Sequence, residues 1–330
     1  MLKDLRQDGI NFKKQERQGL DMSKKKVVFV VGPTASGKTG LAINLAKQFC
    51  GEVISADSMQ IYKGIHIASA APDKEEMQGI PHHLLEFVDR SVQFSVADYV
   101  KLAKEKINEV ASKGSLPVVA GGTGLYITSL LDNTCFIPEK VNPDLRADLE
   151  TEFDSVGAEE MLRRLSEFDP DTAKRLHTND RRRIIRAFEV YRTTGRTITQ
   201  QNTDSHIEES EFEPLVIGIT YSDRQKLYDR INRRVDIMLE NGLVEEARAA
   251  FAEKGGIGGF QAIGHKELFG YFEGEVELQQ AVELLKMQTR RYAKRQLTWF
   301  RRDERINWIY ADEQNPIDAA TELTKNFLKE

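Results

Sequence analysis

The chain alternates short apolar runs with longer segments in which apolar residues recur at helical spacing. Five apolar runs have the length of a buried strand: residues 27–31, 52–56, 117–120, 214–220 and 306–310. After the first run, Leu41, Leu45 and Phe49 recur every four residues, as on the buried face of a helix. A further helix is predicted to begin at Ser95. Strands that alternate with helices favour an α/β fold with a parallel sheet flanked by helices.

The pattern changes between about residues 135 and 206. Apolar runs are absent from this segment, and helical stretches rich in arginine and glutamate replace them. Asp169-Pro170 has the composition of a helix start. We therefore predict an inserted all-helical domain at residues 135–206. The α/β core would consist of residues 22–134 and 207–330, with helices near its carboxyl end.

The turn after the first strand fits the pattern G-x-x-x-x-G-K-[ST] at every fixed position. Its residues are Gly32, Pro33, Thr34, Ala35, Ser36, Gly37, Lys38 and Thr39. In such a loop the backbone N–H groups point inward, the lysine adds a positive charge, and the threonine hydroxyl can bind Mg²⁺. The following helix directs the positive end of its dipole at the same place. The sequence therefore predicts a P-loop NTPase-like core with a phosphate site, but it leaves the phosphate compound open.

Polar residues follow the second and third strands. Asp57 comes directly after the second strand, and Thr123 lies in a Gly-Gly-Thr-Gly turn after the third. Because the carboxyl ends of parallel strands meet at the ligand-binding edge, both residues are expected beside the phosphate loop. A carboxylate there can orient Mg²⁺-bound water or take a proton from a nucleophile. The alternative for Asp57 is the capping of a turn.

The composition is that of an ordinary globular protein, with 330 residues, 40% hydrophobic and 30% charged. Cys50 and Cys135 match no metal or redox spacing, so a reducing compartment is expected. The apolar run at residues 27–31 is too short for a signal peptide or a membrane span, and we expect a cytoplasmic protein. Residues 1–21 are polar and unpatterned, and we predict a disordered segment or a dispensable extension, with a frayed helix as the alternative. A monomer without an obligate protein partner is the default.

Positive charge is concentrated in two segments, although the net charge is −5. Residues 174–196 contain eight basic and two acidic residues, and residues 286–305 have the same balance. Such segments are either solvated helix faces or sites that hold a polyanion. Arg230 and Arg234 are four residues apart on a predicted helix, so both can face one diphosphate or form a surface pair.

Six motifs together resemble the bacterial type of the tRNA dimethylallyltransferase family. They lie at residues 32–39, 57–62 (Asp-Ser-Met-Gln-Ile-Tyr), 81–84 (Pro-His-His-Leu), 121–126 (Gly-Gly-Thr-Gly-Leu-Tyr), 179–187 (Asn-Asp-Arg-Arg-Arg-Ile-Ile-Arg-Ala) and 293–301 (Ala-Lys-Arg-Gln-Leu-Thr-Trp-Phe-Arg). The motifs occur in the family's order over nearly all of residues 27–302. Only the first is widely shared, so the combination is highly specific.

The resemblance implies transfer of a dimethylallyl group from dimethylallyl diphosphate to N6 of the adenosine on the 3′ side of the anticodon, position 37. It assigns the role of base to Asp57 and a catalytic role to Thr123. The phosphate loop, Arg230 and Arg234 would hold the diphosphate, with Mg²⁺ at Thr39. The implied tRNA-binding residues are Asp57, Ser58, Met59, Gln60, Thr123, Arg146, Arg182, Arg183, Ile184, Ile185, Arg186, Arg290 and Lys294. They would contact the anticodon stem-loop.

The chain departs from the family pattern in three places. Residues 68–72 read Ala-Ser-Ala-Ala-Pro where Gly-Thr-Ala-Lys-Pro is usual, His265 replaces a common tyrosine, and Leu85-Glu86 replaces Ile-Asp. The first departure puts in doubt any polar contact that the family makes there. Two other functions compete with the transferase: an ATP-using P-loop kinase of a small metabolite, and an RNA-binding module that binds nucleotide only as a switch. The kinase gives neither basic segment a role.

Overall fold

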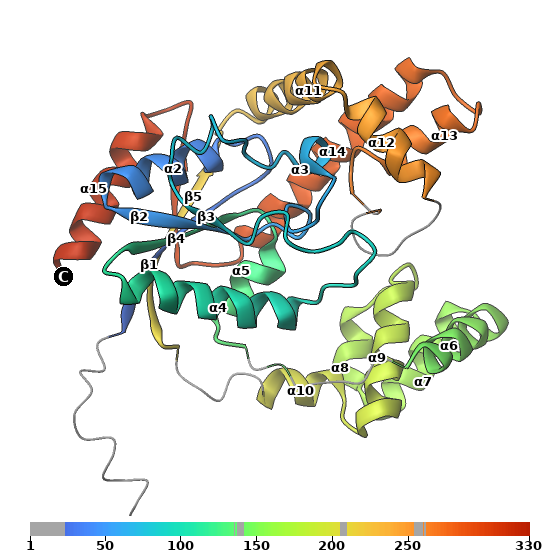
Figure 1. Ribbon diagram of the computed structural model, residues 1–330. Helices are drawn as coiled ribbons and strands as arrows, with labels where there is room; N and C mark the ends of the chain where they lie inside the picture. Colours follow the sequence, from blue (N-terminus) through green and yellow to red (C-terminus); the bar gives the residue numbers. More distant parts are fainter. Residues whose placement is uncertain (1–23, 135, 137–141, 205–209, 254–259, 261) are drawn as a thin grey trace, which may run out of the picture.

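The core of the protein is a parallel sheet. The computed structural model describes residues 24–134, 136, 142–204, 210–253, 260 and 262–330. Within these residues the sheet has six strands in the order β3-β2-β4-β1-β5-β6 (Figure 1). The strands are β1 (Lys25–Val31), β2 (Gly51–Ser55), β3 (His82–His83), β4 (Leu116–Gly121), β5 (Phe212–Thr220) and β6 (Ile306–Tyr310). The predicted α/β fold with a parallel sheet is confirmed. Strand β3 was not predicted, because two histidines carry no strand pattern.

The sheet is buried on both faces because alternate side chains of each strand point to opposite sides. In β1, Phe29 and Val31 pack towards α4 (Val96–Ser112) and α5 (Gly124–Leu131). Val28 and Val30 pack towards α2 (Lys38–Gln48) and α15 (Pro316–Lys329) on the other face. Figure 1 shows α2 and α15 side by side above the sheet and α4 below it. Helix α4 begins as predicted, since Ser95 and Asp98 form a reciprocal cap.

The strand order determines where a ligand can bind. Strand β1 lies between β4 and β5, and the chain that leaves β1 passes through α2 to β2, on the far side of β4. The chain later returns on the opposite side of β1 to form β5. The carboxyl end of β1 is therefore a topological switch point, where α/β sheets leave a crevice for ligands. The phosphate loop occupies this position.

Among the residues that the structure describes between α5 and β5, five helices form a separate cluster. They are α6 (Pro143–Val156), α7 (Ala158–Phe168), α8 (Pro170–Arg175), α9 (Arg181–Thr194) and α10 (Ile198–Asp204). Figure 1 shows them grouped to one side of the sheet. Leu149, Met161 and Ile184 belong to a hydrophobic core of their own. The predicted boundaries at residues 135 and 206 lie outside the described residues and stay predictions, as does the extension at 1–21.

A second group of helices lies beyond the carboxyl ends of the strands. It contains α3 (His66–Ser69), α11 (Arg224–Glu240), α12 (Leu243–Ala252), η2 (Lys266–Leu268), α13 (Phe269–Phe272) and α14 (Leu278–Phe300). Helix α14 begins at Leu278, where Glu277 and Gln280 form a reciprocal cap. Ile231 of α11 and Ala293 of α14 pack against Ala35 of the phosphate loop. Among the described residues, none of the helices combines the length and the apolar character needed to cross a membrane.

Candidate active site

The phosphate loop has the backbone that its glycines predict. Gly32 has φ 147° and Gly37 has φ 100°, both in the region that favours glycine. A Cβ atom on Gly32 would lie 2.3 Å from the carbonyl oxygen of Ile219 in β5, so the close approach of the loop to the sheet also requires glycine. Nζ of Lys38 donates a hydrogen bond to the carbonyl oxygen of Pro33 at 2.7 Å. The loop backbone therefore holds the side chain of Lys38 in place.

Lys38 lies in an electrostatic environment that disfavours its charge. Burial of the ammonium group and, to a smaller extent, the positive charge of Arg234 lower its pKa to about 7, while Asp57 acts in the opposite direction. A lysine in this position gains its full charge when an anion binds beside it. An anion bound beside Lys38 would therefore favour the charged form of the lysine.

A cavity of about 290 Å³ opens beside the loop. Its polar wall contains Thr34, Lys38, Thr39, Asp57, Ser58, Gln60 and Arg234. Its apolar wall contains Ile231, Val235 and Met238 of α11, Ile263, and Leu285 of α14. A ligand that fits this cavity carries negative charge at one end and a hydrocarbon at the other.

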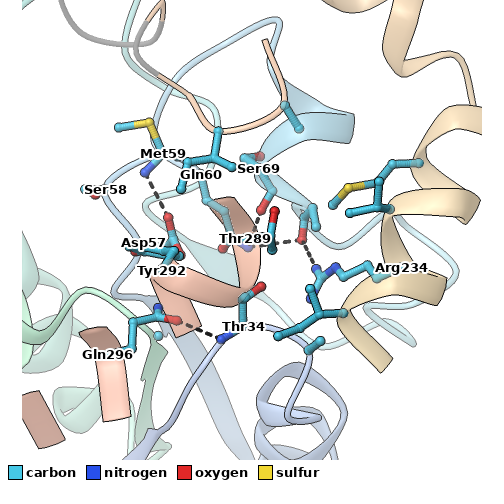
Figure 2. Close-up of a pocket in the computed structure, with 18 of the residues that line it drawn as sticks. Thr34, Asp57, Ser58, Met59, Gln60, Ser69, Arg234, Thr289, Tyr292 and Gln296 are labelled. Atoms are coloured by element: carbon cyan, nitrogen blue, oxygen red, sulfur yellow. Dashed lines mark hydrogen bonds between the residues drawn. The ribbon is translucent and has the colours of Figure 1, made fainter. Parts of the chain in front are cut away.

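Asp57 lies at the carboxyl end of β2 and lines the cavity. Its Oδ1 accepts a hydrogen bond from the backbone N–H of Met59 at 2.8 Å, which is the turn-capping contact expected as the alternative role. The charge of the same carboxylate acts on Tyr292 of α14, which is drawn beside it in Figure 2. Asp57 therefore caps its turn and also lines the cavity.

Thr123 is not among the residues that line the cavity, but it contacts residues that do. Its hydroxyl accepts a hydrogen bond from the backbone N–H of Ser58 at 2.9 Å and lies 3.3 Å from the hydroxyl oxygen of Ser58. These bonds tie the Gly-Gly-Thr-Gly turn to the segment that carries Asp57. A Cβ atom on Gly121 would lie 2.1 Å from the carbonyl oxygen of Ala56, so glycine is required where the two turns meet.

Gln60 is fixed at both ends of its amide. Its Oε1 accepts from the hydroxyl of Ser55 at 2.9 Å, and its Nε2 donates to the carbonyl oxygen of Ala70 at 3.1 Å. Ser69 and Ala70 are part of the segment in which the chain departs from the family pattern. The contact there uses backbone carbonyls, so the altered side chains do not remove it.

Helix α14 contributes cavity residues that were not predicted as site residues, although Gln296 lies in the motif at residues 293–301. Thr289, Tyr292 and Gln296 lie at helical spacing and line the cavity (Figure 2). The buried Gln296 accepts from the backbone N–H of Thr34 at 2.8 Å and donates to the carbonyl oxygen of Gly122 at 2.9 Å, which joins the two glycine turns. Burial raises the pKa of Tyr292, and the negative charge of Asp57 adds to this effect. The helical spacing of these residues is visible in the sequence, but the basic residues of the same segment carry the stronger signal.

Arg230 and Arg234 both face the phosphate loop from α11. Nε of Arg230 donates to the carbonyl oxygen of Ala35 at 3.0 Å. Nη2 of Arg234 donates to Ala70 at 3.4 Å, and Arg234 lines the cavity. Burial of the guanidinium, opposed by Asp57, lowers the pKa of Arg234 from its usual value. Arg234 thus lines the cavity, whereas Arg230 is exposed and contacts the loop backbone from outside the cavity lining, and their binding of a diphosphate stays a prediction.

The predicted tRNA-binding residues of the helical cluster separate into two groups. Arg182, Arg183 and Arg186 are exposed on α9. Ile184 and Ile185 are 0% and 1% exposed, and their side chains lie in the core of the cluster, whereas the prediction expected them to contact tRNA. A motif covers a full helical turn, and only part of that turn faces solvent.

Two further arginines are held by hydrogen bonds or ion pairs. Arg146 of α6 lies 3.2 Å from Glu150 and 3.6 Å from the buried carboxylate of Glu189. Arg290 of α14 donates to Asn232 of α11 at 2.6 Å, whereas Lys294 is exposed. The basic segment at residues 286–305 therefore partly serves to join α14 to α11.

Comparisons with protein-family models and with known proteins identify the same family. A family model described as IPP transferase matches residues 60–303. The tRNA dimethylallyltransferase of Acetivibrio thermocellus is 48% identical over 303 residues, which cover 91% of this chain and 95% of that protein. The tRNA dimethylallyltransferase of Bacillus subtilis is 44% identical over 304 residues, which cover 91% of this chain and 94% of that protein.

Solved structures with a similar fold are members of the same family. The crystal structure of the tRNA isopentenylpyrophosphate transferase of Bacillus halodurans has a TM-score of 0.70 and 41% identity, and the match covers 93% of this chain and 97% of that chain. A eukaryotic dimethylallyltransferase acting on tRNA has a TM-score of 0.79 and 30% identity, with 92% of this chain and 80% of that chain covered. The predicted resemblance is confirmed: the chain belongs to the IPP transferase family.

Proposed function

We propose that the protein transfers the dimethylallyl group of dimethylallyl diphosphate to N6 of adenosine 37, on the 3′ side of the anticodon of tRNA, and releases diphosphate. The observation that carries the proposal is the cavity in which Asp57, the phosphate loop and an apolar wall meet. A small-metabolite kinase is not favoured, because the chain's relatives are tRNA dimethylallyltransferases.

Asp57 is the proposed base. The exocyclic amine of adenine is a poor nucleophile because its lone pair is delocalised into the ring, so removal of its proton aids attack. In the reaction, the bond between C1 of the dimethylallyl group and the bridging oxygen breaks. The bond between C1 and N6 forms, and one N6 proton passes to Asp57. Thr123 supports this step by holding Ser58 next to Asp57.

The leaving diphosphate is proposed to lie on the phosphate loop. Lys38 and Arg234 line the cavity there, and Arg230 contacts the loop at Ala35. Their positive charges would stabilise the negative charge that develops as the carbon–oxygen bond breaks. Thr39 lines the same cavity and offers a hydroxyl of the kind that P-loops use for magnesium. Mg²⁺, when bound at Thr39, would supply further charge stabilisation to the diphosphate.

The apolar wall is the proposed site of the hydrocarbon. Ile231, Val235 and Met238 form one continuous stripe on α11 next to Arg234, and Leu285 of α14 completes the wall. The two ends of dimethylallyl diphosphate match the polar and apolar walls. A base that leaves the anticodon-loop stack would enter near Gln60 and Tyr292.

The helical cluster is the proposed tRNA-binding domain. Arg182, Arg183 and Arg186 present exposed positive charge on one helix, with Arg146 on its neighbour. Phosphate contacts from these residues would supply most of the affinity for the anticodon stem-loop, and the shape of the loop would supply much of the selectivity.

One assay tests the function. The protein is incubated with Mg²⁺, dimethylallyl diphosphate labelled in the hydrocarbon, and unmodified tRNA with adenines after the anticodon. We expect label in the RNA and release of diphosphate. Consumption of ATP without label in RNA would support the kinase, and RNA binding without turnover would support the switch module; either result overturns the proposal.

A further inference from the structure

A largely buried carboxylate outside the cavity holds the short helix α3 in place. The residue before α3, Ile65, makes no side-chain cap. Glu246 of α12 replaces that cap, because one of its carboxylate oxygens accepts from the N–H of Ile67 at 2.8 Å and the other accepts from the N–H of Ala68 at 2.9 Å. The two N–H groups that a cap normally satisfies are thus bound by a residue from a distant part of the chain.

His265 holds the carboxylate in turn. Its Nε2 lies 2.8 Å from Glu246, and the imidazole is completely buried. Burial raises the pKa of the Glu246 carboxyl, but the hydrogen bonds from His265, Ala68 and Ile67 outweigh burial and keep the pKa below its usual value. Glu246 is therefore an ionised carboxylate with three donors, which is a rigid arrangement.

The other end of α3 contacts residues of both proposed substrate sites. The carbonyl oxygens of Ser69 and Ala70 accept from Nε2 of Gln60, at 3.4 and 3.1 Å. The same Ala70 oxygen accepts from Arg234 at 3.4 Å. Gln60 faces the proposed entry of the base, and Arg234 faces the proposed diphosphate position (Figure 2). The carboxyl end of α3 therefore joins these two side chains through hydrogen bonds.

We propose that Glu246, oriented by His265, is a positioning residue for the transfer: it fixes α3 so that Gln60 and Arg234 hold the base and the diphosphate in register. The proposal rests on the proposed function. Glu246 lies outside the cavity lining, so its effect on the reaction passes through α3. Because reacting groups must be aligned closely, a small shift of α3 lowers turnover without changing tRNA binding by the helical cluster.

The test compares Glu246→Gln with Glu245→Gln, its exposed neighbour on the same helix. An amide offers one acceptor oxygen where the carboxylate offers two, so one N–H of α3 loses its partner. We expect Glu246→Gln to lower kcat about ten- to a hundred-fold and to raise KM for dimethylallyl diphosphate. The Kd for tRNA should stay within about two-fold of the unaltered protein, since the contacts with Ile67 and Ala68 lie outside the helical cluster.

A second pair keeps the test decisive if Glu246→Gln does not fold. His265→Gln retains a donor towards Glu246, whereas His265→Met has a similar volume and no donor. We expect His265→Gln to keep most of the turnover and His265→Met to reproduce the loss seen with Glu246→Gln. Equal turnover in the two His265 variants, or in the Gln variants of Glu245 and Glu246, overturns the positioning role. If the unaltered protein itself transfers no dimethylallyl group, the proposed function fails instead.

Discussion

The charged side chains of the cavity depend on one another. Asp57 lies near Lys38 and Arg234, and both basic groups have lowered pKa values because they are buried together. The negative charge of Asp57 favours their charged forms. A substitution at any one of these three residues therefore changes the charge balance of the site as a whole.

Asp57→Asn should separate the charge of Asp57 from its local contact. The amide oxygen of asparagine can still accept the bond from Met59, so the turn is kept while the base is lost. We expect turnover to fall about 10²-fold or more, with tRNA binding nearly intact. The measurement is single-turnover transfer of labelled dimethylallyl groups, with tRNA affinity measured in parallel. Unchanged turnover would show that Asp57 is not the base.

Lys38 should take up a proton when a diphosphate binds. Its pKa of about 7 in the free protein leaves it largely neutral at pH 8, and a bound anion raises that pKa. We expect uptake of about one proton more than in Lys38→Arg, whose side chain stays charged throughout. Calorimetric titration with inorganic diphosphate at about pH 8, in two buffers of different ionisation enthalpy, measures the difference. It should vanish at about pH 5.5, where Lys38 is already charged.

At the scale of elements, the site depends on how closely the ends of β2 and β4 approach. Gly121→Ala places a Cβ atom 2.1 Å from the backbone oxygen of Ala56, next to Asp57. We expect a loss of about 1–3 kcal/mol in the free energy of unfolding together with reduced turnover, as β2 moves away. Gly40→Ala is the control, since a Cβ atom there meets nothing within 4 Å in α2. It should stabilise the protein by about 0.5–1 kcal/mol. Urea unfolding compares the two variants.

Helix α9 should bind tRNA through its exposed arginines. The side chain of Arg183 is 71% exposed and makes a long contact of 3.6 Å with Asp180. We expect Arg183→Ala to weaken tRNA binding and to reduce the slope of log K against log salt by about one. Lys325→Ala is the control, because it removes an exposed charge from α15, which packs on the sheet and not in the helical cluster. It should change neither the affinity for tRNA nor the salt slope. Equal effects of the two substitutions would show that α9 is a solvated helix face that does not bind tRNA.

At the scale of the whole molecule, the helical cluster and the sheet have separate cores. The buried side chains of α6–α10 contact one another, whereas the sheet packs against α2, α4, α5 and α15. Within the cluster, the buried Asp169 joins α8 to α10 by accepting from Thr172 at 3.1 Å and from the hydroxyl of Thr199 at 2.6 Å. Two cores of this kind are expected to open independently.

Hydrogen exchange should therefore resolve two cooperative units. We expect amides of α7 and α9 to exchange with one opening free energy and amides of β1 and β5 with a higher one, because the central strands are buried on both faces. Added tRNA should slow exchange in α9, whereas added diphosphate should slow exchange around the phosphate loop. A single opening free energy for both groups would show that the two parts unfold as one.

The sequence by itself determined the parallel sheet, the phosphate loop and the position of Asp57, because strand runs, glycine spacing and strand ends are local signals. It also determined the family, through six motifs in order. Only the tertiary structure decided that Ile184 and Ile185 are buried and that Thr123 contacts Ser58 rather than lining the cavity. It also decided that Tyr292 and Gln296 complete the site. These features depend on which helix face meets a partner far away in the chain, as does the contact of Glu246 with α3, and spacing along one segment carries no information about that partner.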